Sequence, residues 1–177
     1  MPRCCVNREE LRVVDDDGVA LPAGERGELQ VRGAVMFSEY WNRPDATAES
    51  FADGDWFRTG DVGVRAADGY ITLEGRRSDL IISGGFNIYP REIEELLAEQ
   101  EGVREAAVVG VKDAVRGEVP VAYLVCDATV NLEALAQQVR TQLASFKVPK
   151  RVVFVDALPK NPSGKLLKRD LRVRYAA

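Results

Sequence analysis

The sequence predicts an α+β fold made of two units: a small antiparallel, barrel-like β unit, then an α+β unit with a β-hairpin and a three-stranded sheet packed by helices. Two observations lead to this prediction. Short alternating strands with close Gly/Asp turns begin at Leu11 and continue to residue 75, whereas helical patterns mixed with strands expected to be antiparallel fill residues 76–177. With 177 residues, of which 46% are hydrophobic and 29% charged, the chain is long enough for two small globular units.

The first unit is predicted from short strand patterns and the turns between them. Leu11–Val14 leads into Asp15–Gly18, whose residues suit a hairpin turn. Glu28–Gly33 alternates polar and apolar residues, as a strand with one buried face does. Three further segments complete the unit: a short helix or turn from Tyr40 to Phe51, the stretch Trp56–Asp61, and the strand Tyr70–Leu73.

The second unit begins beyond the charged joint Arg76–Asp79. There, Leu80–Ser83 and Phe86–Ile88 predict a hairpin with a glycine tip. Pro90 suits the first turn of a helix, and acidic residues complement the positive end of that helix. The buried stripe of the helix is Ile93, Leu96 and Leu97.

Two strands, a second helix and a terminal strand–loop–helix follow. Val103–Val111 and Val119–Cys126 are continuous apolar strands, predicted to be central and covered. Asn131 can cap the second helix, and Val152–Val155 predicts a buried strand. The stripe of the second helix is Leu132, Leu135, Val139 and Leu143. A short basic helix is predicted from Leu166 to Tyr175.

The loop Leu158–Lys165 joins that last strand to the basic helix. Two prolines and Gly164 restrict its backbone, so Lys165 is presented at the end of a loop with few conformations. Lysine is a compact cation on a long stem, suited to reaching a phosphate or a carboxylate. A solvated surface lysine in a turn is the alternative interpretation. A Walker loop is excluded, because Leu166 stands where that motif requires Ser or Thr.

Charge is distributed unevenly along the chain. The net charge is −4, but residues 147–175 contain nine basic and two acidic residues. A basic end on an acidic protein predicts an anionic partner, with phosphates the foremost candidates, although a solvated basic face explains it nearly as well. The aromatic interleaving of a base-stacking surface is missing, so no nucleic acid partner is expected.

Composition excludes several kinds of site. The chain has no histidine, which excludes imidazole bases and histidine metal sites. Its three cysteines, Cys4, Cys5 and Cys126, form no metal-binding set, so no metal site is expected. The apolar runs are too short to cross a bilayer, and the N-terminus has no signal pattern. A reduced, cytoplasmic setting is therefore predicted.

Four motifs now stand in a fixed order. They are Gly24 through Pro44, Trp56–Asp61, Gly75–Asp79 continuing through Gly84 and Gly85 to Glu94, and Pro159–Lys165. Together they resemble the C-terminal part of the adenylate-forming enzymes, which include acyl-CoA synthetases, adenylation domains of peptide synthetases and luciferases. The resemblance covers essentially everything after residue 10. It implies that an acid and ATP give an acyl-adenylate and pyrophosphate, after which the small C-terminal domain rotates and a thiol, usually of CoA, takes the acyl group.

The resemblance also implies roles for single residues. Lys165 resembles the lysine that bridges the acid's carboxylate and the α-phosphate, where a cation cancels the repulsion between two anions. Asp61 resembles the carboxylate that accepts hydrogen bonds from both ribose hydroxyls of ATP, and Arg76 resembles a second nucleotide contact. A turn carboxylate that caps backbone donors is the alternative for Asp61.

Arg77, Ser78 and Asp79 resemble the hinge on which the lid rotates. Ser78 departs from the family's usual Asp or Lys, and Asp79 next to it could share the role; a plain surface turn is the alternative. By the same resemblance, CoA would contact Ser83, Gly84, Gly85, Phe146, Lys147 and Lys150. At Gly84 and Gly85, the lack of a Cβ would let the pantetheine thiol pass close to the backbone.

The predicted function is that of the C-terminal portion of an ATP-dependent acid–CoA ligase. Residues 1–75 would be the distal β unit of the large adenylation domain, and residues 76–177 the mobile lid that carries the catalytic lysine. The expected substrates are ATP, CoA and a carboxylic acid, with Mg²⁺ bound mainly by the missing part of the large domain. Because the family's phosphate loop and acid pocket lie upstream of these motifs, we expect a fragment that does not form an adenylate alone.

Three alternatives stay open. The chain could be an adenylation-domain fragment of a peptide synthetase, a module that binds a nucleotide, CoA or a partner without catalysis, or a remnant without function. An exposed apolar face on the β unit would favour self-association into a homo-oligomer. The acid substrate is chosen by a pocket that is absent from these residues.

Overall fold

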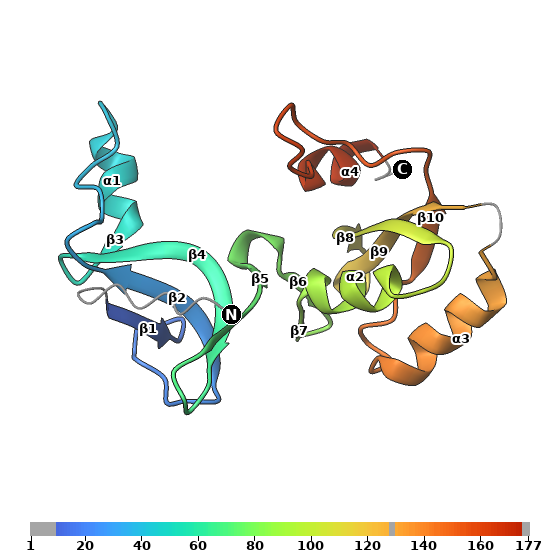
Figure 1. Ribbon diagram of the computed structural model, residues 1–177, viewed down its shortest axis with the longest axis horizontal. Helices are drawn as coiled ribbons and strands as arrows, with labels where there is room; N and C mark the ends of the chain where they lie inside the picture. Colours follow the sequence, from blue (N-terminus) through green and yellow to red (C-terminus); the bar gives the residue numbers. More distant parts are fainter. Residues whose placement is uncertain (1–9, 128–129, 175–177) are drawn as a thin grey trace. The chain divides into compact units, whose positions relative to one another are not determined.

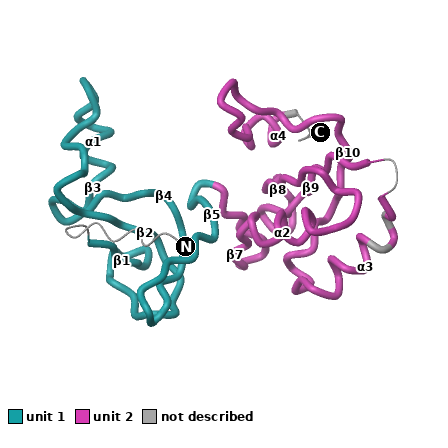
Figure 2. The backbone as a smooth tube through the Cα atoms, in the orientation of Figure 1, with its two compact units in different colours: residues 1–78 teal, residues 79–177 magenta. Residues whose placement is uncertain are grey.

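The computed structural model describes residues 10–127 and 130–174 (Figure 1). The chain divides into two compact units, residues 1–78 and residues 79–177, shown in two colours in Figure 2. This division falls just after the boundary predicted between residues 75 and 76. The predicted features at Cys4, Cys5 and Tyr175 lie outside the described residues, as does the side chain of Leu132.

Unit 1 is a five-stranded antiparallel sheet that resembles half of a barrel. Its elements are β1 (Glu10–Val14), β2 (Arg26–Arg32), α1 (Pro44–Ser50), β3 (Phe51–Ala52), β4 (Trp56–Arg65) and β5 (Ile71–Arg76). The strand order is β1-β2-β4-β3, and β5 also pairs with β4. Its buried apolar side chains are Val13, Val14, Leu29, Trp56 and Val62. The predicted small antiparallel β unit is confirmed.

The first turn of unit 1 connects a different pair of strands from the one its residues suggest. Asp15–Gly18 does form a turn, but beyond it the chain makes only a single bridge, between Val14 and Ala20. β1 pairs instead with β2, which follows a second turn at Gly24, where φ is +90°. Turn chemistry therefore predicted the reversal of the chain but not the partner strand.

Unit 2 is a five-stranded sheet with helices on both faces. Its elements are β6 (Ile81–Ser83), β7 (Phe86–Ile88), α2 (Pro90–Ala98), β8 (Val103–Asp113), β9 (Gly117–Cys126), α3 (Leu132–Gln142), β10 (Arg151–Phe154) and α4 (Lys168–Arg174). The order is β10-β9-β6-β7, and β8 also pairs with β9. The predicted hairpin and three-stranded sheet are therefore one sheet, joined where Ser83 pairs with Gly117.

β9 is central and supplies a core on each face of the sheet. Ala122 and Leu124 belong to the core under α2 and α3, which we call the α2–α3 core. Val121, Tyr123 and Val125, which alternate with these two along β9, belong to the α4 core, which contains Leu171 of α4. The helix stripes predicted from the sequence are buried in the α2–α3 core, namely Ile93, Leu96, Leu97, Leu135, Val139 and Leu143. Successive side chains of a strand point to opposite faces of the sheet. Because both faces of β9 are covered, its sequence is apolar at consecutive positions.

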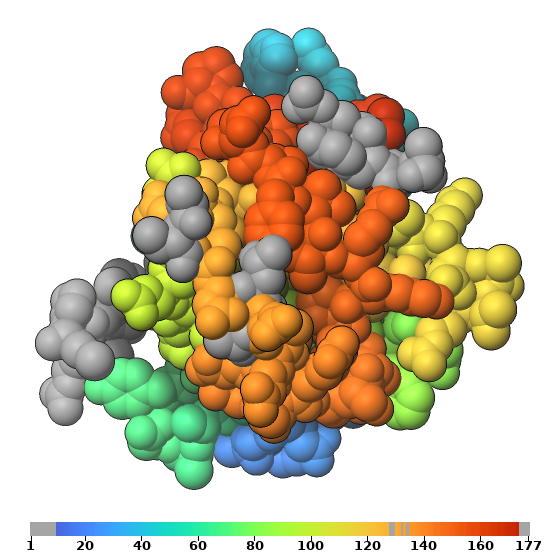
Figure 3. Space-filling view, turned by 90° about the vertical axis from the view of Figure 1, so that its right-hand side faces the viewer, coloured from blue at the N-terminus to red at the C-terminus, as the bar shows by residue number. Residues whose placement is uncertain are grey.

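β10 differs from the prediction in two respects. It pairs with β9 in the parallel direction, with α3 in the crossover between them, whereas only antiparallel strands were expected. It is also an edge strand, with Val152 39% exposed and Phe154 48% exposed, so the prediction of a buried strand was wrong. The space-filling view shows the chain after α3, orange to red, at the surface (Figure 3). Apolar composition alone does not distinguish an edge strand from a central one.

Candidate functional site

The two predicted nucleotide contacts are directly opposite each other in unit 1. Asp61 on β4 pairs with Arg76 on β5, and Nε of Arg76 lies 2.9 Å from Oδ1 of Asp61. Nη1 of Arg76 also donates to the backbone carbonyl of Thr59 at 2.9 Å. The side chains of Asp61 and Arg76 are 29% and 54% exposed, so the pair is accessible to a ligand.

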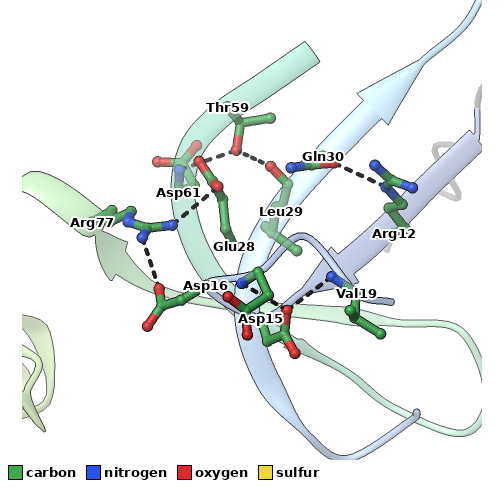
Figure 4. Close-up of polar contacts among 11 residues, drawn as sticks. Arg12, Asp15, Asp16, Val19, Glu28, Leu29, Gln30, Thr59, Asp61 and Arg77 are labelled. Carbon is green, nitrogen blue, oxygen red and sulfur yellow. Dashed lines mark hydrogen bonds and ion pairs between the residues drawn. The ribbon is translucent and has the colours of Figure 1, made fainter. Parts of the chain in front are cut away.

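Hydrogen bonds of Thr59 and the backbone conformation of Gly60 determine the local structure beside Asp61. The hydroxyl of Thr59 donates to the carbonyl of Leu29 at 2.8 Å and accepts from the amide of Asp61 at 3.0 Å (Figure 4). Gly60 between them has a φ of +70°, which glycine adopts without steric cost. In the β4–β5 ladder, the register shifts between Val62 and Gly63 of β4, so Glu74 of β5 is the extra residue of a bulge two positions before Arg76.

Arg77 and Asp79, on either side of Ser78, form ion pairs within different units, Arg77 within unit 1 and Asp79 within unit 2. In unit 1, Arg77 contacts Asp16 at 2.7 Å and the buried carboxylate of Glu28 at 3.2 Å (Figure 4). In unit 2, the carboxylate of Asp79 contacts Arg172 at 3.1 Å and lies 3.9 Å from Lys168, both on α4. Arg77 to Asp79 form a 3₁₀ turn with Ser78 at its centre. The hinge prediction itself stays a prediction.

Asn161, for which no role was predicted, organises the loop that carries Lys165. Its side-chain oxygen accepts three hydrogen bonds, from the amide and hydroxyl of Ser163 at 3.1 and 2.8 Å and from the amide of Lys165 at 2.8 Å. Its backbone amide donates to the carbonyl of Lys165 at 2.9 Å, and its own carbonyl accepts from Gly164 at 2.9 Å. The signal was available, since Asn in a Pro- and Gly-containing loop favours such turns.

The two ends of the lysine loop are anchored to the body of unit 2. Leu158 at the start of the loop and Leu166 directly after Lys165 both pack in the α4 core. Lys160 bridges to Leu166 in the backbone ladder, and its side chain contacts Glu105 at 2.6 Å. Lys165 itself is exposed. The structure therefore presents the lysine on a closed, anchored loop, as the sequence predicted.

The predicted CoA contacts begin at the tip of the β6–β7 hairpin. Gly84 and Gly85 have φ of +57° and +84°, and both are exposed. The amide of Gly84 donates to the carbonyl of Arg116 at 2.8 Å. Just beyond the tip, Phe86 stacks on Phe146, with ring centroids 4.4 Å apart and an interplanar angle of 17°. Ser83 is buried, and its hydroxyl oxygen has no hydrogen-bond partner among the described residues.

Two carboxylates hold the predicted CoA-binding lysines. Nζ of Lys147 lies 2.7 Å from Glu92, and Nζ of Lys150 lies 3.1 Å from Asp113. Asp113 also accepts the backbone amides of Val115 and Arg116, each at 3.0 Å. These amide donors and Lys150 lower the pKa of Asp113 to about 2, so the carboxylate is ionised at neutral pH.

The hairpin tip, the β8–β9 turn and the segment from Phe146 to Lys150 therefore meet in one region. Arg116 lies at the centre of this region and was not predicted, because an exposed arginine in a turn has no distinguishing sequence pattern. Phe146 packs against the α2–α3 core, whereas the ends of the lysine loop pack in the α4 core. The structure therefore brings predicted CoA contacts together, and one of them, Phe146, packs on the opposite face of the sheet from the ends of the Lys165 loop.

Two further findings concern the described part of the chain. Within residues 10–127 and 130–174, no cluster of three or more His, Cys, Asp or Glu side chains could hold a metal ion. Among the helices of the same residues, none is long and apolar enough to cross a membrane.

Comparison with known proteins identifies a domain within the chain. Residues 92–165 match the model of the AMP-binding enzyme C-terminal domain. This part of the chain is similar to the C-terminal domain of the AMP-binding, adenylate-forming enzymes. The match begins on α2 and ends at Lys165, so the lysine loop lies within it, while Asp61 and Arg76 lie before it.

Individual AMP-binding enzymes are similar over nearly the whole chain. The long-chain-fatty-acid–CoA ligase FadD13 of Mycobacterium tuberculosis (strain H37Rv) is 44% identical over 169 residues, which are 95% of this chain and 33% of that ligase. The 2-succinylbenzoate–CoA ligase of Bacillus cereus (strain ATCC 10987) is 46% identical over 163 residues, which are 92% of this chain and 34% of the ligase. The chain thus spans about a third of the length of the curated relatives it matches.

A solved AMP-binding enzyme also shares the fold. The crystal structure of ATP-bound MatB from Rhodopseudomonas palustris matches with a TM-score of 0.90 and 42% sequence identity. The match covers 96% of this chain and 34% of MatB. The α+β architecture and the resemblance found in the motifs are both confirmed.

Proposed function

We propose that this chain acts as the C-terminal part of an ATP-dependent ligase that joins a carboxylic acid to CoA through an acyl-adenylate, releasing AMP and pyrophosphate. The observation that carries the proposal is that unit 2 presents two chemically different surfaces. One is the anchored Lys165 loop, whose ends pack in the α4 core, and the other combines the glycine tip, the cations and the aromatic stack, of which Phe146 packs against the α2–α3 core. Such a pair suits a reaction in two steps with different reacting groups.

In the first step, Lys165 would act at the reacting atoms. A carboxylate oxygen of the acid attacks the α-phosphorus of ATP, and pyrophosphate leaves. Both reactants are anions, so a cation between them lowers their repulsion and stabilises the charge that grows on the phosphate oxygens. The anchored loop, closed by Asn161, supports this role because it fixes the backbone from which the lysine extends.

Asp61 and Arg76 would hold the nucleotide in the same step. The ribose hydroxyls would donate hydrogen bonds to the carboxylate of Asp61, which Arg76 contacts from the neighbouring strand. Their exposure on unit 1 supports a role in ligand contact rather than in the core.

In the second step, the CoA surface would receive the thiol substrate. The open space beside Gly85 would let the pantetheine chain pass along the backbone, since no atom lies within 4 Å of the position of a Cβ there. Phe146 offers an aromatic face, and the side chains of Lys147, Lys150 and Arg116 would attract the phosphates of CoA.

The domain roles follow from these assignments. Unit 1 would be the distal β unit of the large domain, and unit 2 the mobile lid, which turns at the hinge formed by Arg77, Ser78 and Asp79. Mg²⁺ would be held mainly by the part of the relatives that lies outside this chain. We place the reaction in the cytoplasm, where ATP and CoA are available. Exposed aromatic side chains on unit 1, such as Trp41 at 85%, would support self-association into a homo-oligomer.

Complementation tests the proposal. The purified chain is mixed with the N-terminal domain of a related ligase that lacks its own lid, and AMP release that depends on ATP, CoA and acid is followed. We expect rescue by the native chain and by Lys112→Ala, an exposed lysine on β8 that serves as the control, but not by Lys165→Ala. Failure of the native chain to rescue, together with tight CoA binding by the chain alone, would instead support a binding module.

A further inference from the structure

Two carboxylates from distant segments meet one face of α4. Nζ of Lys168 lies 2.8 Å from Oε1 of Glu94 on α2 and 3.9 Å from Oδ2 of Asp79. Nη2 of Arg172 lies 3.1 Å from Oδ1 of Asp79. Lys168 and Arg172 are one helical turn apart and so point from the same side of α4. We call these four side chains the α4 latch.

The α4 latch is less exposed than an ordinary surface ion pair. Its side chains are 17% (Lys168), 20% (Glu94), 22% (Asp79) and 35% (Arg172) exposed, against 60% and 55% for the pair Arg104–Asp127 of the same unit. Partly buried charges are screened less by water and salt. Oε1 of Glu94 also accepts the amide of the buried core residue Val108 at 2.7 Å, so the sheet fixes that carboxylate.

The latch is connected to the lysine loop by a very short segment. Lys168 begins α4 only three residues after Lys165, and Leu166 between them packs in the α4 core. Leu171, which is 1% exposed, holds the buried side of the same helix. The orientation of α4 therefore sets the direction in which the loop leaves the body of unit 2.

We propose that Asp79 is a positioning residue for Lys165, acting through Lys168 and Arg172. Asp79 follows Ser78 directly and is the first residue of unit 2. The α4 latch therefore connects this residue rigidly to α4 and, through α4, to the lysine loop. Any change in the backbone at Ser78 then carries the lysine loop along with Asp79. The functional meaning of this connection rests on the proposed role of Lys165, but the connection can be measured without any activity.

Hydrogen exchange of the full 177-residue chain tests the connection. In Asp79→Asn, we expect amide exchange of Lys165 and of α4 to rise about fivefold or more, and the amide resonance of Lys165 to shift. Asp79→Glu, which keeps the charge, is expected to restore exchange to within about twofold. Asp127→Asn removes the exposed pair with Arg104 and serves as the charge-matched control, expected to leave the loop unchanged.

The amides of β9 are the internal reference for folding. Equal increases in β9 and α4 would show general loss of stability and would overturn the proposal, as would unchanged exchange in the double variant Asp79→Asn, Glu94→Gln. A resonance shift of Lys165 that Asp79→Glu does not reverse would overturn it as well.

The complementation assay separates this inference from the proposed function. A latch confirmed by exchange, combined with no effect of Lys165→Ala on AMP release, would leave the connection standing and reject the ligase role. Where Lys165→Ala abolishes AMP release, Asp79→Asn should lower the rate about tenfold and Asp79→Glu should recover it.

Discussion

The guanidinium of Arg76 contacts the carboxylate of Asp61 at 2.9 Å across the β4–β5 ladder. Both residues were predicted from separate motifs to contact the same nucleotide. The register of two antiparallel strands places them side by side, and Arg76 uses a second nitrogen to bind the carbonyl of Thr59. The carboxylate is thereby held in one orientation before any ligand arrives, which reduces the entropy lost on binding.

Replacing Asp61 tests whether this carboxylate serves a ligand. Asp61→Asn keeps the shape but removes the charge, so complemented AMP release should fall about 10- to 100-fold, the loss expected for charge-assisted hydrogen bonds. The free energy of unfolding should change by only about 0.2–1 kcal/mol, because the ion pair with Arg76 is partly exposed. Kinetics and chemical denaturation of the same variant give both numbers. An unfolding loss that matches the activity loss would assign Asp61 a structural role alone.

The stability of the hairpin tip should depend on the backbone conformation that glycine allows at position 85, and not on the absence of a side chain from a crowded site. Gly85 has a φ of +84°, and no atom lies within 4 Å of the position of a Cβ. Gly85→Ala should therefore lower the free energy of unfolding by about 1 kcal/mol through the left-handed conformation alone. Gly85→Asn should cost less, because asparagine tolerates this region. Denaturation with urea measures both, and equal losses in the two variants would contradict the argument.

The lysine loop should depend on the side-chain oxygen of Asn161. Asn161→Ala removes the acceptor of three hydrogen bonds and should destabilise the loop by about 1–2 kcal/mol. Exchange of the Lys165 amide reports this change directly, because that amide donates to the oxygen. Asn161→Asp keeps an oxygen in place and should retain the protection. Loss of protection in the aspartate variant would show that the amide group, and not its oxygen, shapes the loop.

The stack of Phe86 on Phe146 should couple the hairpin to the segment after α3. The ring geometry predicts a coupling of about 0.5–1.5 kcal/mol in a double-mutant cycle with Phe86→Leu and Phe146→Leu. If Phe146 also contacts CoA, Phe146→Leu should weaken CoA binding more than Phe86→Leu does. Additive stability losses would show that the two rings do not interact in solution.

The β8–β9 turn should carry a pH dependence that arises from Asp113. The backbone amides of Arg116 and Val115, and then Lys150, lower the pKa of Asp113 to about 2 from an ordinary value of about 3.9. A lowered pKa gives stability that is present above pH about 4 and is lost as the pH falls through about 2. Side-chain carboxyl NMR titration measures this pKa. Lys150→Met should raise it only partly, since the amides contribute most; a return to the ordinary value in that variant would contradict the assignment.

Lys165, Asp61 and Arg76 were singled out because each stands in a short motif that resembles one of the adenylate-forming enzymes, and their roles stay predictions. Some of their structural supports, such as Thr59 beside Asp61 and Asn161 beside Lys165, lie in the same motifs. Arg116 was missed because its relation to Gly84 arises between two turns that are remote in sequence. The α4 latch was missed for the same reason, as its carboxylates and cations come from three separate segments.

The sequence by itself determined the local structure of this protein. Alternation, capping and turn residues specified the strands of unit 1, the hairpin, both amphipathic helices and the closed lysine loop, because each depends on interactions within a few residues. Only the tertiary structure decided that β10 pairs in parallel at the edge, that β1 pairs with β2, and that Phe146 and the ends of the lysine loop pack on opposite faces of one sheet. These features depend on which distant segments bury apolar surface together, and an apolar run does not specify its partner.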